Sequence, residues 1–379
     1  MRKLVYSAVA LTLVSVPGFA SENEWSSLDQ EINNLSSSLS AQNAPGPKLG
    51  GFIRTSFRYS TDQDALFGGP PNNEDESGFK LDKVRIEITG DAGQDYSYKV
   101  SFELKSGTAS LRDAYASWKV ADNVKGTMGR FKKPVLHSAM ISDKNLLFTE
   151  RTALGGFLDA RDTGLMFSGT FETIEWSLAA QNGLDQKENK MNYALRVAAN
   201  LMGTGVGKVE GAYGAGQETN LTVGIAWSED KAISQQGGDG SMYGGDFMLT
   251  SGPFSLAAEA VVFGKGDALN GSFPAKDGGD LHFGSDNTFV SVDPADNTSW
   301  DVTGSYMFTE QYEAAIRYES AQANTPTAGT DPSVTAISAA INRYVQGHDI
   351  KWTLQYLATS SDDTTNEIAE WTLGLTVGI

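Results

Sequence analysis

Basic side chains recur at alternating positions in several short segments of the first third of the chain. These residues are Arg54, Arg58, Lys83, Arg85, Lys99, Lys119 and Lys125. Alternation places side chains on one face of a β-strand, and neighbouring strands lie about 4.8 Å apart. Partly desolvated charges at such separations interact with roughly 3 to 4 kcal/mol at an effective dielectric of about 20. The pattern predicts one basic wall that biases which ions come near it.

A second charged group occupies the stretch from Arg130 to Asp162. Its bases are Lys132, Lys133, Arg151 and Arg161, and its acids are Asp143, Glu150, Asp159 and Asp162. Opposed charges across a narrow passage create a transverse field that sorts small polar solutes by charge and dipole. The alternative interpretation is that these residues pair with each other and only hold the stretch in place.

Residues for catalysis or metal binding are scarce. The chain has no cysteine, and its three histidines, His137, His282 and His348, are not spaced as a ligand pair. An outer-membrane enzyme of phospholipase type would need a histidine beside an activated serine. His137 and Ser138 are adjacent but have no evident orienting acid. We therefore expect no catalytic residues, no metal and no cofactor.

The elements that must position these charges are short segments with a period of two. We predict sixteen strands, at Phe52–Tyr59, Phe79–Thr89, Tyr96–Lys105, Leu111–Val120, Val124–Arg130, Thr163–Thr170, Thr173–Gln181, Met191–Leu201, Leu221–Ser228, Met242–Thr250, Phe254–Phe263, Trp300–Phe308, Tyr312–Glu319, Thr335–Val345, Ile350–Ala358 and Ile368–Ile379. An even number of alternating segments of about ten residues is typical of an outer-membrane barrel. The predicted fold class is all-β, a 16-stranded antiparallel transmembrane β-barrel.

The lengths of the connections support this threading, because such barrels have long loops outside and short turns inside. Long connections fall on one side, at Ser60–Gly78, Arg130–Asp162, Glu229–Ser241 and Gly264–Ser299. Most connections on the other side are brief, for example Gly90–Asp95 and Ser251–Pro253. Met202–Asn220 is long but falls on the short side, and the sequence offers no reason for its length.

The stretch from Arg130 to Asp162 is far longer than an ordinary connection of about 4 to 6 residues. It also carries ten large apolar side chains, among them Leu136, Phe148 and Phe157, which need a place to pack. We predict that this third outer loop folds inward and narrows a pore.

Four regions divide the chain. Residues 1–20 carry Arg2 and Lys3, an apolar run and small residues at Gly18 and Ala20, which is the pattern of a secretory signal peptide. Residues 21–42 have apolar residues at heptad spacing, namely Trp25, Leu28, Ile32, Leu35 and Leu39. This spacing predicts a periplasmic coiled-coil helix for oligomerisation, or alternatively an amphipathic helix on the barrel rim. Residues 43–50 form a linker, and residues 51–379 form the barrel.

Charge and hydropathy narrow the localisation. The net charge is −18 and bases are dispersed, which argues against nucleic-acid binding. After residue 20 no run of 18 apolar residues could form a spanning helix. Aromatic residues gather near strand ends, as at a membrane interface. We expect a protein of the Gram-negative outer membrane, in contact with lipid and lipopolysaccharide.

Part of the central region resembles a known family. The segment Gly126-Thr-Met-Gly-Arg-Phe-Lys-Lys-Pro134, followed by Phe148-Thr-Glu-Arg151 and Ala160-Arg-Asp-Thr-Gly164, is similar to the phosphate-selective porin O and P family. The likeness extends loosely from Gly51 to Ile379. It implies a sixteen-stranded homotrimeric barrel, an inward third loop, and lysines and arginines that guide anions. The heptad helix is an addition to that plan.

Two functions remain open from the sequence. The first is an outer-membrane porin, a water-filled channel for passive diffusion of small hydrophilic solutes or ions, with a preference for anions or phosphate. The acidic outer loops oppose strong phosphate specificity, because they would repel anions at the mouth. The alternative is a non-conducting structural tether or adhesin with a periplasmic coiled coil.

Overall fold

The computed structural model describes residues 46–61, 76–105, 108–183, 191–231, 240–264, 281–285, 288–292, 297–323, 333–361 and 369–379. The predicted signal peptide and the heptad helix with Trp25, Leu28, Ile32, Leu35 and Leu39 lie outside these residues, as do residues 43–45 of the predicted linker. Residues 48–50, which were predicted as linker, belong to the first strand.

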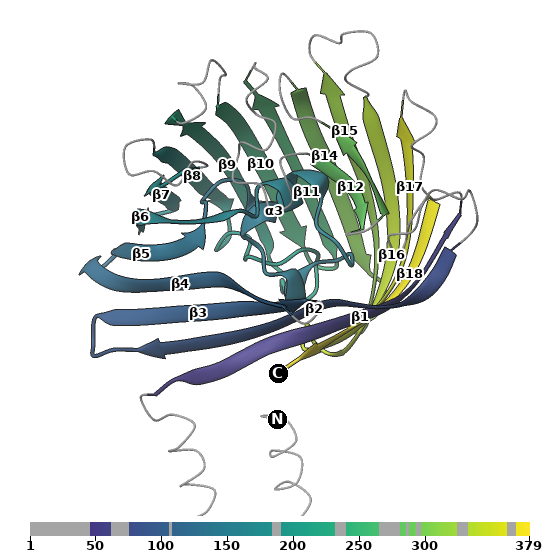
Figure 1. Ribbon diagram of the computed structural model, residues 1–379, viewed down its shortest axis with the longest axis horizontal. Coiled ribbons are helices and arrows are strands. Elements are labelled where there is room, and N and C mark those ends of the chain that lie inside the picture. Colours follow the sequence, from purple (N-terminus) through teal and green to yellow (C-terminus); the bar gives the residue numbers. More distant parts are fainter. Residues whose placement is uncertain are drawn as a thin grey trace, which may run out of the picture. The chain divides into compact units, whose positions relative to one another are not determined.

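Sixteen strands within the described residues close into one antiparallel barrel, in which β1 pairs with both β2 and β18 (Figure 1). The barrel strands are β1 Lys48–Thr61, β2 Glu76–Asp91, β3 Tyr96–Lys105, β4 Thr108–Ala121, β5 Val124–Lys132, β6 Arg161–Phe171, β7 Ile174–Gln181, β8 Asn192–Met202, β9 Thr219–Asp230, β10 Ser241–Ser251, β11 Phe254–Phe263, β14 Asn297–Met307, β15 Tyr312–Ala323, β16 Val334–Gln346, β17 Ile350–Ser361 and β18 Ala369–Gly378. Each corresponds to one predicted strand, so the predicted 16-stranded antiparallel barrel is confirmed.

Five shorter elements complete the described structure. They are α3 (His137–Met140), the 3-10 turn η1 (Asp143–Asn145), α4 (Ala153–Phe157), and the two strands of a separate hairpin, β12 (Leu281–Ser285) and β13 (Thr288–Val292). The sequence did not predict this hairpin, which lies within the long Gly264–Ser299 connection. Among the described residues, no helix is long and apolar enough to span a bilayer.

Alternation gives each strand a lipid-compatible face and a polar face. On the outside, Ile225, Tyr243 and Ile316 are 65%, 60% and 59% exposed. On the inside, Arg58, Glu313 and Asn342 are almost fully buried. An apolar exterior around a polar interior is the arrangement of a transmembrane barrel and the inverse of a soluble sandwich.

The register shifts in five of the described strand pairs, and two of these β-bulges change which charged side chains face inward. The register between β1 and β2 shifts at Arg54/Thr55, and that between β3 and β4 shifts at Ser101/Phe102. A bulge places two residues of one strand opposite one residue of its partner. Consequently Asp82 and Arg112 join the inward-facing side chains, although strict alternation places both on the outer face.

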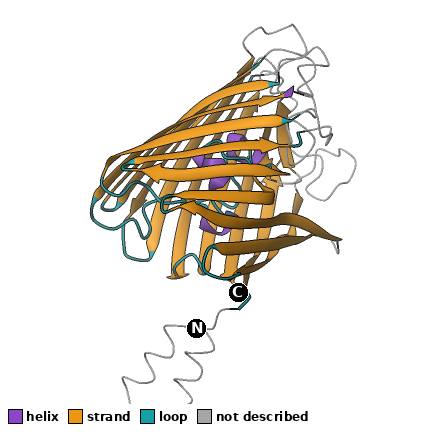
Figure 2. Ribbon diagram, turned by 90° about the vertical axis from the view of Figure 1, so that its left-hand side faces the viewer, coloured by secondary structure: helices purple, strands orange, loops and turns teal. Residues whose placement is uncertain are grey.

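The barrel has a turn end and a loop end. The turn end carries the connections that follow β2, β4, β6, β8, β10, β14 and β16, and the loop end carries the others. Residues 133–160, called here the third loop, connect β5 to β6 at the loop end. Figures 1 and 2 show α3 and α4 of this loop within the ring of strands.

The third loop contributes seven residues to an apolar core inside the barrel. Leu136, Leu154 and Phe157 pack with Phe263 of β11 and with Leu281 of β12. The rings of Phe157 and Phe263 meet edge to face at 5.4 Å. The apolar residues of the loop therefore pack against one another, the hairpin and a few inward-facing apolar side chains.

Candidate functional site

The acidic side of the barrel interior accepts hydrogen bonds from main-chain N–H groups of the third loop. The N–H of Ser138 donates to Glu259 on β11 at 2.8 Å. The N–H of Ala153 donates to Glu319 on β15 at 2.6 Å. The N–H of Thr149 donates in the same way to the Gln355 amide oxygen on β17 at 2.9 Å. These wall residues satisfy backbone donors that a loop buried away from water must pair.

Basic and amide side chains complete the attachment by donating to carbonyl groups of the same loop. Arg196 on β8 donates to Val135 at 2.6 Å, and Asn342 on β16 donates to Leu147 at 2.8 Å. Arg317 on β15 donates to Glu150 O at 3.1 Å, and its guanidinium lies 4.0 Å from the centre of the Phe148 ring. The loop is therefore held through its backbone by strands on different sides of the barrel.

Bases of β1 and β2 surround two acids of the loop. Lys83 and Arg85 contact Asp143 at 3.2 and 2.8 Å, and Arg151 of the loop contacts the same carboxylate at 3.0 Å. Burial alone would raise the pKa of Asp143, but these cations hold the pKa well below its usual range. Asp143 therefore stays ionised in the folded protein.

Glu150 binds the other bases of this group. Its carboxylate lies 3.2 Å from Arg58 and 3.7 Å from Arg54. Arg58 also contacts Asp82 at 2.8 Å and Glu370 at 3.2 Å. Three of the predicted pore-lining bases, Arg54, Arg58 and Lys83, are thus buried in ion pairs that join the loop to the barrel wall.

Asp159 is the centre of a second ion-pair group, on the β4–β6 side. Arg112 and Arg161 contact its carboxylate at 2.8 and 3.1 Å, and Lys132 contacts it as well. Burial would raise the pKa of Asp159, but the cations Arg151, Arg161 and Lys132 keep the pKa far below its usual range. Arg161 also contacts Asp113 of β4 at 2.9 Å.

A cavity of about 750 Å³ lies beside this second group, between the β2–β7 wall and the third loop. It extends to the turn end, because residues of the turns after β2 and β4, including Asp95 and Asn123, line it. Pro134, Met140 and Ser142 of the loop form part of its other side. This space is large enough to admit hydrated ions and small polar molecules.

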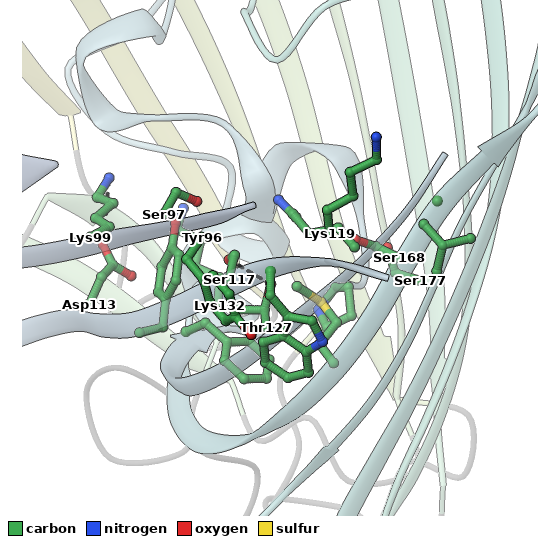
Figure 3. Close-up of a pocket in the computed structure, with 18 of the residues that line it drawn as sticks. Tyr96, Ser97, Lys99, Asp113, Ser117, Lys119, Thr127, Lys132, Ser168 and Ser177 are labelled. Carbon is green, nitrogen blue, oxygen red and sulfur yellow. Dashed lines mark hydrogen bonds and ion pairs between the residues drawn. The ribbon is translucent and has the colours of Figure 1, made fainter. Parts of the chain in front are cut away.

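Lysines and hydroxyl groups give the cavity its chemistry (Figure 3). Lys119 and Lys125 stand directly opposite each other on β4 and β5, and Ser168 is the β6 partner of Lys125. Like charges at directly opposed positions repel each other. An anion between them would relieve this repulsion, and hydroxyls such as Thr127 and Ser177 can donate to it.

The predicted residues therefore separate into groups. Cavity-lining members are Arg85, Lys99, Lys119, Lys125, Lys132 and Arg161. Arg54, Arg58, Lys83 and Arg151 are in the ion pairs that attach the loop. Lys133 is buried and donates to Ser228 of β9 at 3.3 Å. Asp162 accepts from the N–H groups of Thr163 and Gly183, both at 2.7 Å, at the end of the wall.

Three functional candidates were missed from sequence. Asp82 and Arg112 depend on the bulges, whose positions are fixed by strand pairing. Lys208 lines the cavity although it belongs to the connection between β8 and β9. The unusual length of that connection is the one signal that could have drawn attention to it.

The described residues contain no group of three or more histidine, aspartate or glutamate side chains arranged to hold a metal ion. The charged groups instead pair with one another and with the main chain, an arrangement suited to holding the loop and to setting the charge of the cavity.

Solved structures with the same fold include several outer-membrane proteins. The outer membrane channel DcaP of Acinetobacter baumannii is 14% identical, with a TM-score of 0.56 over 88% of this chain and 97% of that chain. OmpF of Salmonella typhi, in complex with daunomycin, is 14% identical, with a TM-score of 0.57 over 89% of this chain and 99% of that one. A loop-deletion mutant of OmpT from Vibrio cholerae is 11% identical, with a TM-score of 0.56 over 88% of this chain and 99% of that chain. At these identities the likeness concerns the fold.

Comparison with curated proteins gives no match. The family model described as phosphate-selective porin O and P matches residues 53–371, which is most of the chain. The central motifs between Gly126 and Gly164 fall within this match. The chain therefore belongs to the phosphate-selective porin O and P family.

Proposed function

We propose that the protein is a diffusion porin that passes small hydrophilic solutes and prefers anions. Family and fold indicate a channel of the Gram-negative outer membrane rather than an enzyme. The proposal adds that solutes cross through the cavity along the β2–β7 wall. The observation that carries it is the facing pair Lys119 and Lys125 in a cavity of about 750 Å³ lined with hydroxyls.

The preference for anions follows from how the cavity charges are paired. Of the described residues, seven bases and six acids line it. Three of the acids are paired with its bases: Glu87 lies 3.0 Å from Lys99, Asp122 lies 2.7 Å from Lys119, and Asp113 pairs with Arg161. The Lys119–Asp122 pair is well exposed, so solvent weakens it and leaves the lysine available to a passing anion. The family name points to phosphate as one such anion.

We propose that the third loop is the constriction element of this channel. Its attachment to β8, β11, β15, β16 and β17 supports this role, because chain held there occupies the lumen away from the β2–β7 wall. Asp143, Glu150 and Asp159 serve mainly to fix the loop. The cavity-lining bases then set the field that solutes meet.

Planar-bilayer recording tests the proposal. Purified protein should form ion-conducting pores, and in a KCl gradient the zero-current potential should have the sign of anion selectivity. Lys125→Glu should shift this potential towards cations. Lys48→Glu is the matched control, since Lys48 is exposed at the turn end outside the cavity and the charge change is identical.

Two outcomes would contradict the proposal in different ways. Wild-type protein that inserts but carries no current would leave the structural tether as the function. Equal potentials for the Lys125→Glu and Lys48→Glu variants would show that ions do not pass through this cavity.

A homotrimer in contact with lipid and lipopolysaccharide is the proposed assembly, delivered by the signal peptide of residues 1–20. The resemblance to the family and the heptad residues Trp25, Leu28, Ile32, Leu35 and Leu39 support the trimer. The exposed apolar outer face supports the lipid contact.

A further inference from the structure

The connection between β8 and β9, residues 203–218, does not remain at the barrel rim. Its middle is buried, with Glu210 at 9% and Ala212 at 4% exposure. The N–H of Glu210 donates to the carbonyl of Asn145 in the third loop at 3.1 Å. The N–H of Leu147 donates to the Glu210 carboxylate at 2.8 Å. This connection therefore reaches the third loop from the opposite end of the barrel.

Side chains of β15 and β16 hold this segment in place. Arg317 contacts Glu210 at 3.1 Å, and the N–H of Ala212 donates to Glu313 at 2.6 Å. The Tyr344 hydroxyl donates to the other oxygen of Glu313 at 2.6 Å. The ring of Tyr213 then stacks on Tyr344, with 3.9 Å between centroids.

Gly211 makes this contact possible. Its φ of +90° belongs to the left-handed region, which favours glycine. A Cβ at this position would lie 2.6 Å from the Glu313 carboxylate and 2.7 Å from Leu147. Gly214, in the same segment, has a similar φ of +81° but nothing within 4 Å of its Cβ position.

The segment also presents Lys208 to the cavity. Burial lowers the pKa of Lys208, and the charges of Lys125 and Arg196 lower it further while Glu175 opposes them. Lys208 and Lys125 line the same cavity. The carbonyl of Lys208 accepts from the Asn145 amide at 3.4 Å, which ties its backbone to η1.

We infer that residues 203–218 are a second inward constriction, entering from the turn end, and that Lys208 is a specificity-determining residue of the conduit. This inference rests on the proposed channel function. The segment closes the β14–β17 side of the lumen, so that solutes are confined to the β2–β7 side. Lys208, Lys119 and Lys125 then bring three ammonium groups from separate elements to one passage, which suits oxyanions.

Thiol modification tests the placement of Lys208, because the chain has no cysteine of its own. Lys208→Cys should lose current when a negatively charged methanethiosulfonate reagent is added from the turn side. Lys48→Cys should not change. In unmodified protein, Lys208→Gln should lower the anion-to-cation permeability ratio by roughly two- to fivefold, since a unit charge about 4 Å from an ion in water acts with an energy equivalent to about fivefold in occupancy.

The contact of residues 203–218 with β15 and β16 is tested by comparing the Gly211→Ala variant with the Gly214→Ala variant. Both substitutions impose the same left-handed cost, but only the first meets Glu313 and Leu147. We expect larger and noisier conductance for Gly211→Ala and wild-type conductance for Gly214→Ala, with unchanged circular dichroism and heat-modifiable gel mobility in both.

A wild-type current combined with no effect of the reagent on Lys208→Cys would overturn the inference but leave the channel intact. Absence of wild-type current would instead refute the channel function. If Gly211→Ala does not fold, the Lys208→Cys result alone decides.

Discussion

His137 is a buried imidazole at the start of α3, where the third loop meets the acidic side of the barrel. Burial lowers its pKa to about 4, Asp246 opposes this shift, and Arg196 and Lys208 reinforce it. Glu259 and Asp301 line the same small pocket as His137. The neutral imidazole is thus the form that the folded loop accommodates.

This burial makes stability depend on pH. A histidine whose pKa is lower in the folded state loses stability as the pH falls from its unfolded value near 6.5 towards about 4, because the unfolded chain binds the proton first. The full effect amounts to roughly 3 kcal/mol. Urea unfolding at pH 7.5 and pH 5 should show a smaller loss of stability for His137→Gln than for wild type. Equal losses would mean that His137 is not buried as described.

Asp143 and Asp159, with their lowered pKa values, stabilise the folded protein in their charged form, whereas His137 is stable there in its neutral form. Their pKa values are held low, so their contribution is complete above the ordinary carboxylate range and is lost only when the pH falls through the depressed values. Neither acid should contribute to a difference between pH 7.5 and pH 5. Burial also lowers the pKa of His348, to about 3, so His348 adds its own loss of stability over this range. The difference between wild type and His137→Gln therefore reports His137.

At the scale of elements, α4 is a five-residue helix whose stability comes from its surroundings. The Thr152 side chain accepts from the N–H of Gly155 at 2.9 Å and caps its start. Helices this short are not stable alone in water. Phe157, packed against Phe263 and the β12 hairpin, is therefore its main attachment.

We expect Phe157→Ala to destabilise the protein by about 3 to 5 kcal/mol, the usual cost of a large cavity in a core. It should also increase conductance, because the third loop loses its contact with β11 and β12. Phe171→Ala is the control, since Phe171 is 63% exposed on the outer face. Urea midpoints and single-channel amplitudes would measure both effects. Similar results for the two variants would show that α4 does not depend on this packing.

Strand positions could be predicted from the sequence because lipid outside and polar groups inside impose the same period on every strand. The positions of the bulges could not be predicted, because a one-residue shift depends on the paired strand. Asp82 and Arg112 were missed for that reason. Residues 203–218 and the β12–β13 hairpin could not be predicted either. Their positions depend on fits such as Tyr213 on Tyr344, between residues distant in sequence.

The charged residues show the same division. Inward-facing bases such as Lys99 and Lys125 were identified by alternation alone. Which of them line open space was not predictable, because Arg54 and Lys83 differ from Lys125 only in what the third loop places against them.

At the scale of the whole molecule, the proposed trimer can be tested through residues 21–42. Two and a half heptads are too short to form a stable coiled coil alone. The predicted coiled coil can therefore form only when the barrels already hold the helices together. Replacing Leu28, Ile32 and Leu35 by serine should lower the temperature at which the oligomer dissociates, while the conductance of each pore stays unchanged. Multi-angle light scattering in detergent would report the mass.

The control for that test replaces Ser36, Ser37 and Ser38 by alanine, which leaves the heptad residues intact. Loss of the oligomer in both variants, or in neither, would argue against a coiled coil.

Closure of β1 against β18 has a consequence for biogenesis. Arg58 and Glu370 form a buried pair across this seam at 3.2 Å, although 312 positions separate them in the chain. Strand β1 is exported first, but its partner β18 is exported last. One hydrogen-bonding edge of β1 therefore stays unpaired until export is complete. That edge therefore needs protection until β18 has been exported. A chain that ends before β18 would keep unpaired strand edges, which favour aggregation, and would not close into a smaller pore.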